Sequence, residues 1–197
     1  MEEDQREENA MRRFMVFFAW IVGLVLLVGC AGVPKQPRML AAGFHELQLR
    51  RVTLAPLVFR DDPIDRYFAQ RVGGEILAQT EAALTAKGYA VTPAGGEEIL
   101  FPFGDQKVGP FSPTEGDDAV LAIEIDNFLD AVLYDRSAPL GLDIYATATL
   151  ISRGGDVLWQ DTGVGRGMRT STVPGQMDWF ITSRSLVQSL FTTFPSR

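Results

Sequence analysis

The sequence is poor in the residues that build metal and catalytic centres. Its 197 residues contain one cysteine, Cys30, and one histidine, His45. A single cysteine excludes a disulfide framework and a cysteine-based zinc site within the chain, and a single histidine excludes a two-histidine metal motif. Lys and Arg number 18 against 25 Asp and Glu, giving a net charge of −7. This balance argues against a nucleic-acid-binding protein, which needs a basic face.

The amino-terminal segment has the pattern of an export signal. Two arginines precede an uncharged apolar run over residues 14–28, which closes on Gly29 and Cys30. A basic flank, an apolar core of about 7–15 residues and small residues at its end are typical of a secretory signal peptide. The five acidic residues within 1–10 are unusual for such a signal. Translation from Met11 would remove them, and the sequence leaves both starts open.

The tetrapeptide LVGC at residues 27–30 resembles the lipobox of bacterial lipoproteins. The resemblance implies cleavage between Gly29 and Cys30, diacylglycerol on the Cys30 thiol and a third acyl chain on the new amino group. Two or more acyl chains give a stable hold on a membrane. Ala31, in place of Asp, favours the outer membrane by the same resemblance, with the folded part facing the periplasm; the inner membrane stays an alternative.

A second interpretation of the same segment is an uncleaved transmembrane helix. Residues 14–33 supply about the 20 apolar residues that span a bilayer. Both interpretations place residues 31–197 outside the cytoplasm, because the arginines stay inside. The boundaries we predict are a signal peptide over 1–29, a lipidated tether over 30–43 and a single α/β domain over 44–197. Residues 30–197 carry a net charge of −5, so we expect no electrostatic docking of the body on anionic lipid.

The first half of the predicted domain favours a β-α-β unit. Residues 51–59 have the β-branched content of a buried strand, with Pro56 marking an edge or an end. A helix starts at Asp62-Pro63, follows an apolar stripe from 64 to 84 and ends at Gly88. The glycine pair at 73 and 74 predicts close packing of this helix on a sheet. Residues 89–93 then form a short strand.

The second half favours an antiparallel meander. Strands are predicted over 118–134, 142–150 and 157–163, with a hairpin turn at 153–156. Asp178 can cap a closing helix that ends before Pro195. The order is β-α-β-loop-β-β-β-α. A mixed sheet with helices packed on one face, a two-layer α/β sandwich, is the predicted fold class.

Residues 94–118 are predicted to form a long loop with one turn of helix at most. The segment holds five glycines, three prolines and the aromatic residues Phe101, Phe103 and Phe111. Loops of this length are commonly functional or mobile. The rings either tuck back onto the body or form an exposed patch that contacts a partner.

Few other residues suggest chemistry. Glu124 and Asp126 share a strand face and could form an acid–base pair, although a solvated sheet face or salt bridges to arginines are strongly favoured for them. A Ser-His-Asp or Cys-His catalytic arrangement would have to use His45. Because His45 lies just after the tether and Cys30 is expected to be acylated, we interpret His45 as a surface residue. The glycines at 163, 165 and 167 lack the spacing of a dinucleotide loop and predict a strand with close backbone approaches. Arg166 and Arg169 are read as exposed partners for acidic side chains.

Four segments give the domain a resemblance to periplasmic α/β domains of the TolB amino-terminal and CsgG type. They are VTLAPL at 52–57, LTAKGY at 84–89, DAVLAI at 118–123 and the hairpin ATLISRGGDVLW at 148–159. The resemblance covers most of residues 50–195 and implies an accessory part of an envelope assembly or transport system. The four matching segments contain no reacting groups.

Three hypotheses follow for the function. The first is a lipid-anchored accessory protein that binds an envelope protein or further copies of itself, by strand addition at a sheet edge or through the 94–118 loop. The second is a lipid- or glycan-binding module, which predicts an apolar pocket of several hundred Å³ between helix and sheet. The third and least favoured is a hydrolase. We expect no enzyme activity, no metal and no cofactor beyond the acyl chains on Cys30.

Overall fold

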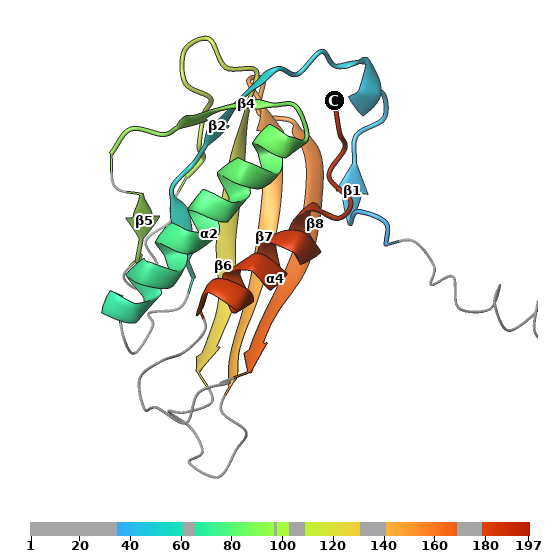
Figure 1. Ribbon diagram of the computed structural model, residues 1–197. Helices are drawn as coiled ribbons and strands as arrows, with labels where there is room; N and C mark the ends of the chain where they lie inside the picture. The colour runs from blue at the N-terminus through green and yellow to red at the C-terminus, as the bar shows by residue number, and fades with distance from the viewer. Residues whose placement is uncertain (1–34, 61–65, 97, 103–108, 131–140, 169–178) are drawn as a thin grey trace, which may run out of the picture. The chain divides into compact units, whose positions relative to one another are not determined.

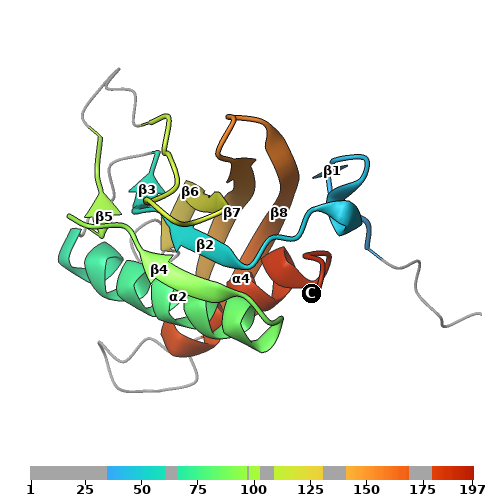
Figure 2. The same cartoon turned by 90° about the horizontal axis from the view of Figure 1, so that it is seen from above.

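One mixed sheet carries both α-helices of the described chain on the same face (Figure 1). The computed structural model describes residues 35–60, 66–96, 98–102, 109–130, 141–168 and 179–197. Residues Gln36–Arg197 belong to one compact unit. Seen from above, α2 and α4 lie side by side against one side of the strands (Figure 2). The predicted two-layer α/β fold with a mixed sheet is therefore confirmed.

The elements follow one another in the predicted order, with two short strands added. The strands are β1 (Met39–Leu40), β2 (Arg51–Leu54), β3 (Leu57–Phe59), β4 (Ala90–Pro93), β5 (Ile99–Leu100), β6 (Ala119–Asp130), β7 (Gly141–Ser152) and β8 (Val157–Met168). The helices are the 3-10 turn η1 (Phe44–Glu46), α2 (Arg66–Ala86) and α4 (Trp179–Phe191). The sheet runs β1-β8-β7-β6-β2-β4, and β3 pairs with β5 and β6 beside this path.

The strand predicted over 51–59 is divided in two. β2 lies parallel to both β4 and β6, whereas β3 lies parallel to β5 and β6. The division falls at Pro56, which has no N–H to donate to a neighbouring strand. On either side of it the chain changes partner, since Ala55 N donates to Leu121 O at 2.9 Å and Leu57 N donates to Glu98 O at 2.8 Å. The prediction of one continuous strand over 51–59 was wrong, whereas the interpretation of Pro56 as marking a strand end is confirmed.

Strands β6, β7 and β8 form the predicted antiparallel meander. Leu121, Ile123 and Ile125 are buried under the helices, as the alternation of the sequence indicates. The turn between β7 and β8 is the predicted one: Ser152 Oγ accepts the N–H groups of Gly154 and Asp156, each at 3.1 Å. Strand β8 continues to Met168, beyond the predicted end at 163.

Two glycines of β8 let α4 approach the sheet backbone. A Cβ atom at Gly163 would lie 2.6 Å from Leu190 Cγ, and one at Gly165 would lie 2.5 Å from Thr182 O and 2.7 Å from Leu186 Cβ. Real Cβ atoms do not come this close to another heavy atom. The prediction of a strand with close backbone approaches is confirmed, because only glycine leaves room for the helix here.

Helix α2 packs through the predicted stripe, of which Val72, Ile76 and Leu84 are fully buried. Gly73 makes the predicted close approach: its Cβ position lies 2.8 Å from Ile99 Cδ1 and 3.0 Å from Leu57 Cδ2. Gly74 does not, since nothing lies within 4 Å of its Cβ position. The interpretation of the glycine pair was therefore right for one member only. The predicted helix start at 62–65 lies outside the described residues.

The closing helix α4 buries the predicted inner stripe, including Leu186, Leu190 and Phe191. Its predicted cap, Asp178, lies outside the described residues. The chain after the helix then packs back on the core, where the rings of Trp159 and Phe194 meet edge to face at 4.7 Å. Aromatic contacts of this kind favour a fixed position for the carboxyl-terminal residues.

Two stretches predicted to be irregular contribute strands. Residues 39–40, assigned to the tether, form β1 and pair with Trp159 and Gln160 of β8. The fold therefore begins before residue 44. Ile99 and Leu100, assigned to the long loop, form β5 against β3. Two residues are too few for a periodic pattern, so neither strand could be predicted from the sequence. The described part of 94–118 contains no helix.

Asp118 fixes the approach of β2 to β6. Its Oδ2 atom accepts the backbone N–H groups of Arg50 at 2.7 Å and Arg51 at 2.9 Å. These bonds lower the pKa of the Asp118 carboxyl from its ordinary value of 3.8, with the bond from Arg51 the largest cause. Hydrogen bonds to a carboxylate favour the charged form.

Replacing Gly165 with alanine tests the close approach of α4. Gly165→Ala is expected to lower the free energy of unfolding by about 2 kcal/mol, because the added methyl group collides with the backbone of α4. Gly154→Ala, where the nearest atom would be 3.4 Å away, serves as the control and should change little. Urea unfolding followed by circular dichroism measures both. Equal effects of the two substitutions would contradict this packing.

Replacing Asp118 with asparagine tests its two backbone bonds. Asp118→Asn should cost about 1 kcal/mol near neutral pH, because the charged acceptor is lost. The lowered pKa places this stabilisation above pH 3.8, and it is lost as the pH falls through the folded-state value. Urea unfolding at neutral pH and at about pH 3 should therefore show the difference between wild type and variant shrinking in acid. Glu81→Gln, at an exposed site on α2, should show no such convergence.

Candidate functional site

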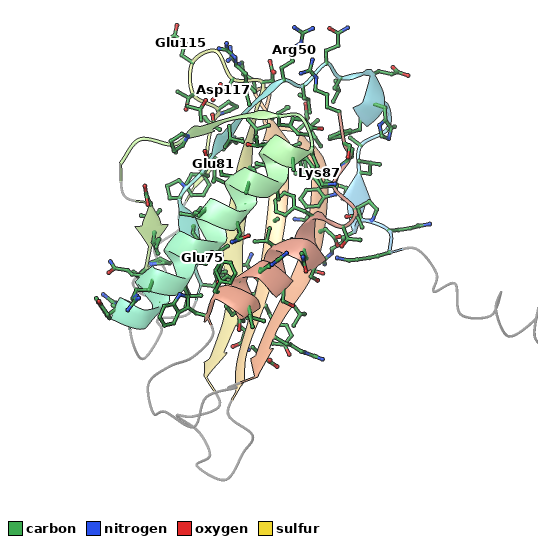
Figure 3. The ribbon with its side chains drawn as sticks, viewed as in Figure 1. Arg50, Glu75, Glu81, Lys87, Glu115 and Asp117 are labelled. Carbon is green, nitrogen blue, oxygen red and sulfur yellow. The ribbon has the colours of Figure 1, made fainter. Side chains whose placement is uncertain are left out.

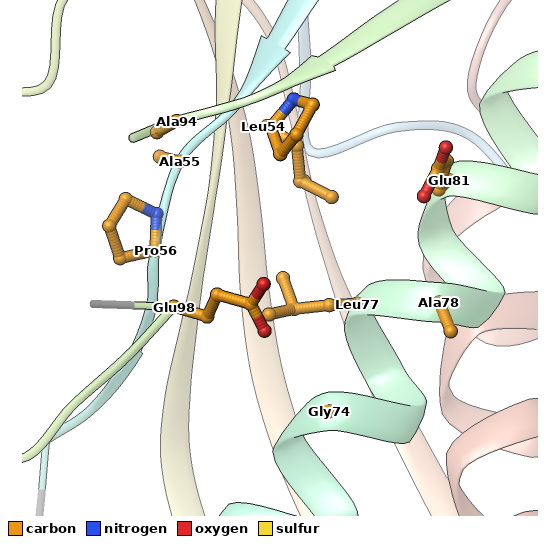
Figure 4. Close-up of a pocket in the computed structure, with 10 residues that line it drawn as sticks. Leu54, Ala55, Pro56, Gly74, Leu77, Ala78, Glu81, Ala94 and Glu98 are labelled. Carbon is orange, nitrogen blue, oxygen red and sulfur yellow. The ribbon is translucent and has the colours of Figure 1, made fainter. Parts of the chain in front are cut away.

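A recess of about 200 Å³ opens between α2 and the chain that leaves β2 and β4 (Figure 4). We refer to it as the α2 recess. Most of its lining is apolar, and two glutamates complete it. The lining residues are Leu54, Ala55, Pro56, Gly74, Leu77, Ala78, Glu81, Pro93, Ala94 and Glu98.

The α2 recess is open because six of its ten lining residues are glycine, alanine or proline. Gly74 has no side chain, so its side of α2 stays open toward the recess. This place beside the recess accounts for the absence of a close contact between Gly74 and the sheet. Opposite α2, Pro56 interrupts the chain between β2 and β3, and Pro93 ends β4. A glycine inside a helix costs about 1 kcal/mol relative to alanine, so its presence here has a stability cost. The open space beside Gly74 is therefore part of the fold.

The charge of the α2 recess has one sign. Glu81 and Glu98 lie on two sides of it, with the Glu98 carboxylate beside Leu77 (Figure 4). No basic residue is among the described residues that line it. The recess therefore suits a group with an apolar stem and a positively charged end.

The size of the α2 recess limits what it can hold. Pockets that bury small-molecule ligands usually measure about 300–1,000 Å³. At about 200 Å³ the recess is smaller than the pocket that the lipid- or glycan-binding hypothesis predicts, and it fits one amino-acid side chain. A broader, open hollow of about 620 Å³ lies at the end of the sheet, but its lining includes Asp117, Asp118, Arg153 and Asp156. It is not the apolar cleft between helix and sheet that was predicted.

Asp117 is a buried carboxylate beside the start of β6. It is 4% exposed, and its Oδ2 atom accepts the Thr53 hydroxyl at 2.7 Å. Thr92 Oγ1 donates to Oδ1 at 3.4 Å, and Arg153 Nη2 donates to the backbone oxygen of Asp117 at 2.6 Å. These bonds join β2, β4 and the β7–β8 turn at one end of the sheet. Asp117 thus has a structural role at this end of the sheet.

The proposed acid–base pair of Glu124 and Asp126 is an ion-pair cluster. Arg60 Nε donates to Glu124 Oε2 at 2.8 Å and lies 3.3 Å from Asp126 Oδ1. The bond to Glu124 is the main cause of a raised Arg60 pKa. Asp126 also accepts the Thr147 hydroxyl at 2.6 Å. The salt-bridge interpretation is confirmed, and the carboxylates are engaged with these partners.

The predicted aromatic contact residues are placed as follows. Phe101 stacks on Phe59 with ring centroids 5.1 Å apart, and Phe111 packs on a small apolar cluster on the face of the sheet away from the helices. Both rings are half-buried. Phe103 lies outside the described residues, so the prediction of a partner-contact patch stays a prediction. Figure 3 shows Arg50, Glu115 and Asp117 together at the upper end of the molecule.

Several other predicted residues can be placed. His45 is exposed on η1, as expected of a surface residue. Arg166 is exposed and lies 3.9 Å from Asp143, which confirms its interpretation as a partner for an acid. Gly29, Cys30 and Arg169 lie outside the described residues. Within the described residues, no group of three or more His, Cys, Asp or Glu side chains could hold a metal ion.

The edges of the sheet carry features that hinder strand addition. On β8, Thr162 N donates to Asp161 Oδ1 at 2.8 Å and Val164 N donates to Ser189 Oγ at 3.3 Å. Side chains therefore occupy two N–H groups that an added strand would need. On the opposite edge, β4 ends with Pro93, which has no N–H. Strand addition by a partner stays a prediction.

No helix among the described residues has both the length and the apolar character needed to cross a membrane. The proposed transmembrane interpretation of residues 14–33 falls outside that part of the chain.

The chain resembles solved bacterial structures, although no protein-family model and no curated protein sequence matches it. The PelC dodecamer of Paraburkholderia phytofirmans aligns with a TM-score of 0.50 at 16% identity, over 83% of this chain and 95% of that chain. A minor lipoprotein of Acinetobacter baumannii aligns with a TM-score of 0.38 at 14% identity, over 72% and 89% of the two chains. A DUF330 protein of Xanthomonas campestris aligns with a TM-score of 0.41 at 13% identity, over 81% and 88%. The chain therefore shares its fold with PelC, and the resemblance to TolB and CsgG stays a prediction.

Proposed function

We propose that this protein is a lipid-anchored accessory protein of the bacterial envelope that works as a homo-oligomer. The observation that carries the proposal is the shared fold with PelC, which was solved as a dodecamer and aligns over 95% of its chain. The LVGC segment at 27–30 supports the anchored location. Fold likeness alone is a weak warrant for function, so the proposal also depends on the surfaces of this chain.

The surfaces favour an interface made by side chains. Side chains occupy two N–H groups of β8, whereas the α2 recess offers a hole of the size of one side chain. A contact in which a side chain of one copy enters a recess on another part of the next copy is heterologous, and such contacts form a ring when the rotation between copies closes. Glu81 and Glu98 at the α2 recess favour an arginine or lysine as the entering residue. The second hypothesis, lipid or glycan binding, is not favoured because the recess is too small for such a ligand.

The anchor would hold the oligomer at the outer membrane with its folded part in the periplasm. Acyl chains on Cys30 would supply this anchor, and Ala31 favours the outer membrane over the inner one by resemblance to other lipoproteins. An accessory role without enzyme activity agrees with the few candidate catalytic residues, since Glu124 and Asp126 are engaged in ion pairs with Arg60.

Acylation of Cys30 is the first prediction of this function. Cells that express the wild-type chain should incorporate labelled palmitate into it, and globomycin should cause the uncleaved precursor to accumulate. Cys30→Ser should abolish the label, because the thiol that carries diacylglycerol is gone. Gel fluorography of immunoprecipitated protein measures both effects. A wild-type chain that stays unlabelled and is released from the membrane fraction would refute the anchor.

Self-association through the α2 recess is the second prediction. Light scattering of the full chain in detergent should give the mass of an oligomer for wild type and a smaller mass for Gly74→Leu, since leucine fills the recess. Leucine is also a better helix former than glycine, so loss of fold is not the expected cause. Gln70→Leu, at an exposed position on the same helix, should leave the oligomer intact. A monomeric wild type, or an unaffected Gly74→Leu oligomer, would count against this interface.

A further inference from the structure

Helix α4 exposes apolar side chains together with one positive charge. Phe180 and Ile181 are 46% and 48% exposed, on the helix whose inner stripe is already buried. Arg184 is exposed one turn further along and is the only charged residue of α4, and Gln188 is exposed after another turn. These positions are three and four residues apart, so they share one side of the helix. We refer to the four residues as the α4 face.

The Arg184 guanidinium is available to a partner. The ion pairs of the described chain join Arg60 and Arg166 to carboxylates, and they do not include Arg184. Arg71 of α2 is also engaged, since its guanidinium carbon lies 4.4 Å from the centroid of the Trp179 ring. An arginine beside exposed apolar side chains is typical of residues that anchor a protein–protein contact.

The α4 face and the α2 recess belong to opposite sides of the helical layer. Helix α4 packs on β8 and β7, whereas α2 packs on β4 and β5. The sheet order β1-β8-β7-β6-β2-β4 places β8 and β4 far apart. Both ribbon views show β5 on one side of α2 and α4 on the other (Figures 1 and 2). Two copies that lie side by side in the same orientation therefore bring α4 of one toward the recess of the next.

The two surfaces are complementary in charge and in polarity. The α2 recess carries Glu81 and Glu98 with no basic residue in its described lining, whereas Arg184 is the single charge of α4. A guanidinium group presents five N–H donors in a planar fork, so it can bind carboxylates that approach from two sides. Leu77 and Pro56 line the recess as well and suit the apolar stem of an arginine.

We propose that Arg184 of one copy enters the α2 recess of the next copy and binds Glu81 and Glu98 there. This inference rests on the proposed homo-oligomer and names the second surface of its interface. Phe180 and Ile181 leave water in the same contact, which adds a hydrophobic contribution to the ion pairs. Each copy offers the α4 face on one side and the recess on the other, so the copies follow one another head to tail.

A second surface with similar chemistry competes for the recess. On β1, Met39 and Leu40 are 41% and 40% exposed, and Arg38 precedes them. The α4 face is favoured because α4 is held against the sheet at Gly165, so Arg184 starts from a fixed backbone position. A preorganised side of an interface loses less conformational entropy on binding than a two-residue strand at the end of the sheet.

Reversal of the two charges tests the contact. Light scattering of the full chain in detergent, over a dilution series, gives the concentration at which half of the oligomer has dissociated. Arg184→Glu and Glu81→Arg should each raise this concentration at least about tenfold, because like charges then meet in the recess. The chain that carries both substitutions should recover most of the wild-type association, since opposite charges meet again. Loss of folding cannot produce such a recovery.

Matched controls separate this contact from general effects of charge. Arg166→Glu on β8 and Glu46→Arg on η1 make the same charge changes at exposed positions, and both should leave the dilution curve unchanged. Association that is weakened by Arg38→Glu and unaffected by Arg184→Glu would overturn the proposal in favour of β1. A double variant no better than its two parents would also overturn it.

Introduced cysteines test the head-to-tail arrangement. Ala78→Cys lies in the recess and Gln188→Cys on the α4 face, both at exposed positions. An acylated Cys30 has no free thiol, so a short bismaleimide joins only the introduced cysteines. The chain with both should form a ladder of covalent multimers on a denaturing gel, while each single variant stays a monomer. A covalent dimer from either single variant would indicate a two-fold symmetric contact and overturn the proposal.

Failure of the oligomer can be told apart from failure of this interface. A wild-type chain that is monomeric at every concentration refutes the proposed homo-oligomer, and the contact with it. A wild-type oligomer that dissociates on Gly74→Leu but not on Arg184→Glu uses the α2 recess with another side chain, and refutes only the contact proposed for Arg184.

Discussion

The close approach of the helices to the sheet is the constraint on which the rest of the structure depends. At Gly163 and Gly165 of β8 the backbone of the sheet meets side chains and backbone of α4, and at Gly73 the α2 backbone meets Leu57 and Ile99. Interiors as dense as this allow little movement between layers. Both helices are consequently held on one face, and the other face keeps its polar residues and ion pairs, as antiparallel sheets commonly do.

The parts of the fold that could be predicted are those with a repeating pattern. The alternation through Leu121, Ile123 and Ile125 and the four-residue spacing of α2 were sufficient to place β6 and α2. The pattern fails where a partner distant in sequence decides the outcome. The buried Asp117 carboxylate is satisfied by hydrogen bonds from Thr53 and Thr92, and β1 forms by pairing with β8. No local signal in the sequence shows either partner.

The candidate site was harder to predict than the fold. Gly74 was predicted to pack closely together with Gly73. Gly73 does lie against other side chains, whereas the space beside Gly74 is open. The difference between the two depends on which way each Cα faces from α2, together with the positions of Pro56 and Pro93 on other elements. The carboxylates that looked most like chemistry, Glu124 and Asp126, instead hold Arg60. Sequence spacing could identify the pair but not its partner.

The hydrogen bonds that occupy Thr162 N and Val164 N matter most when many copies are crowded together. Proteins tethered to one bilayer diffuse in two dimensions and collide far more often than the same number in solution. An open β-strand would turn such collisions into amyloid-like stacking, because strands recruit one another through their main chains. If the chain is anchored as we propose, Asp161 and Ser189 would reduce such pairing in a dense layer of molecules, because they satisfy those donors internally.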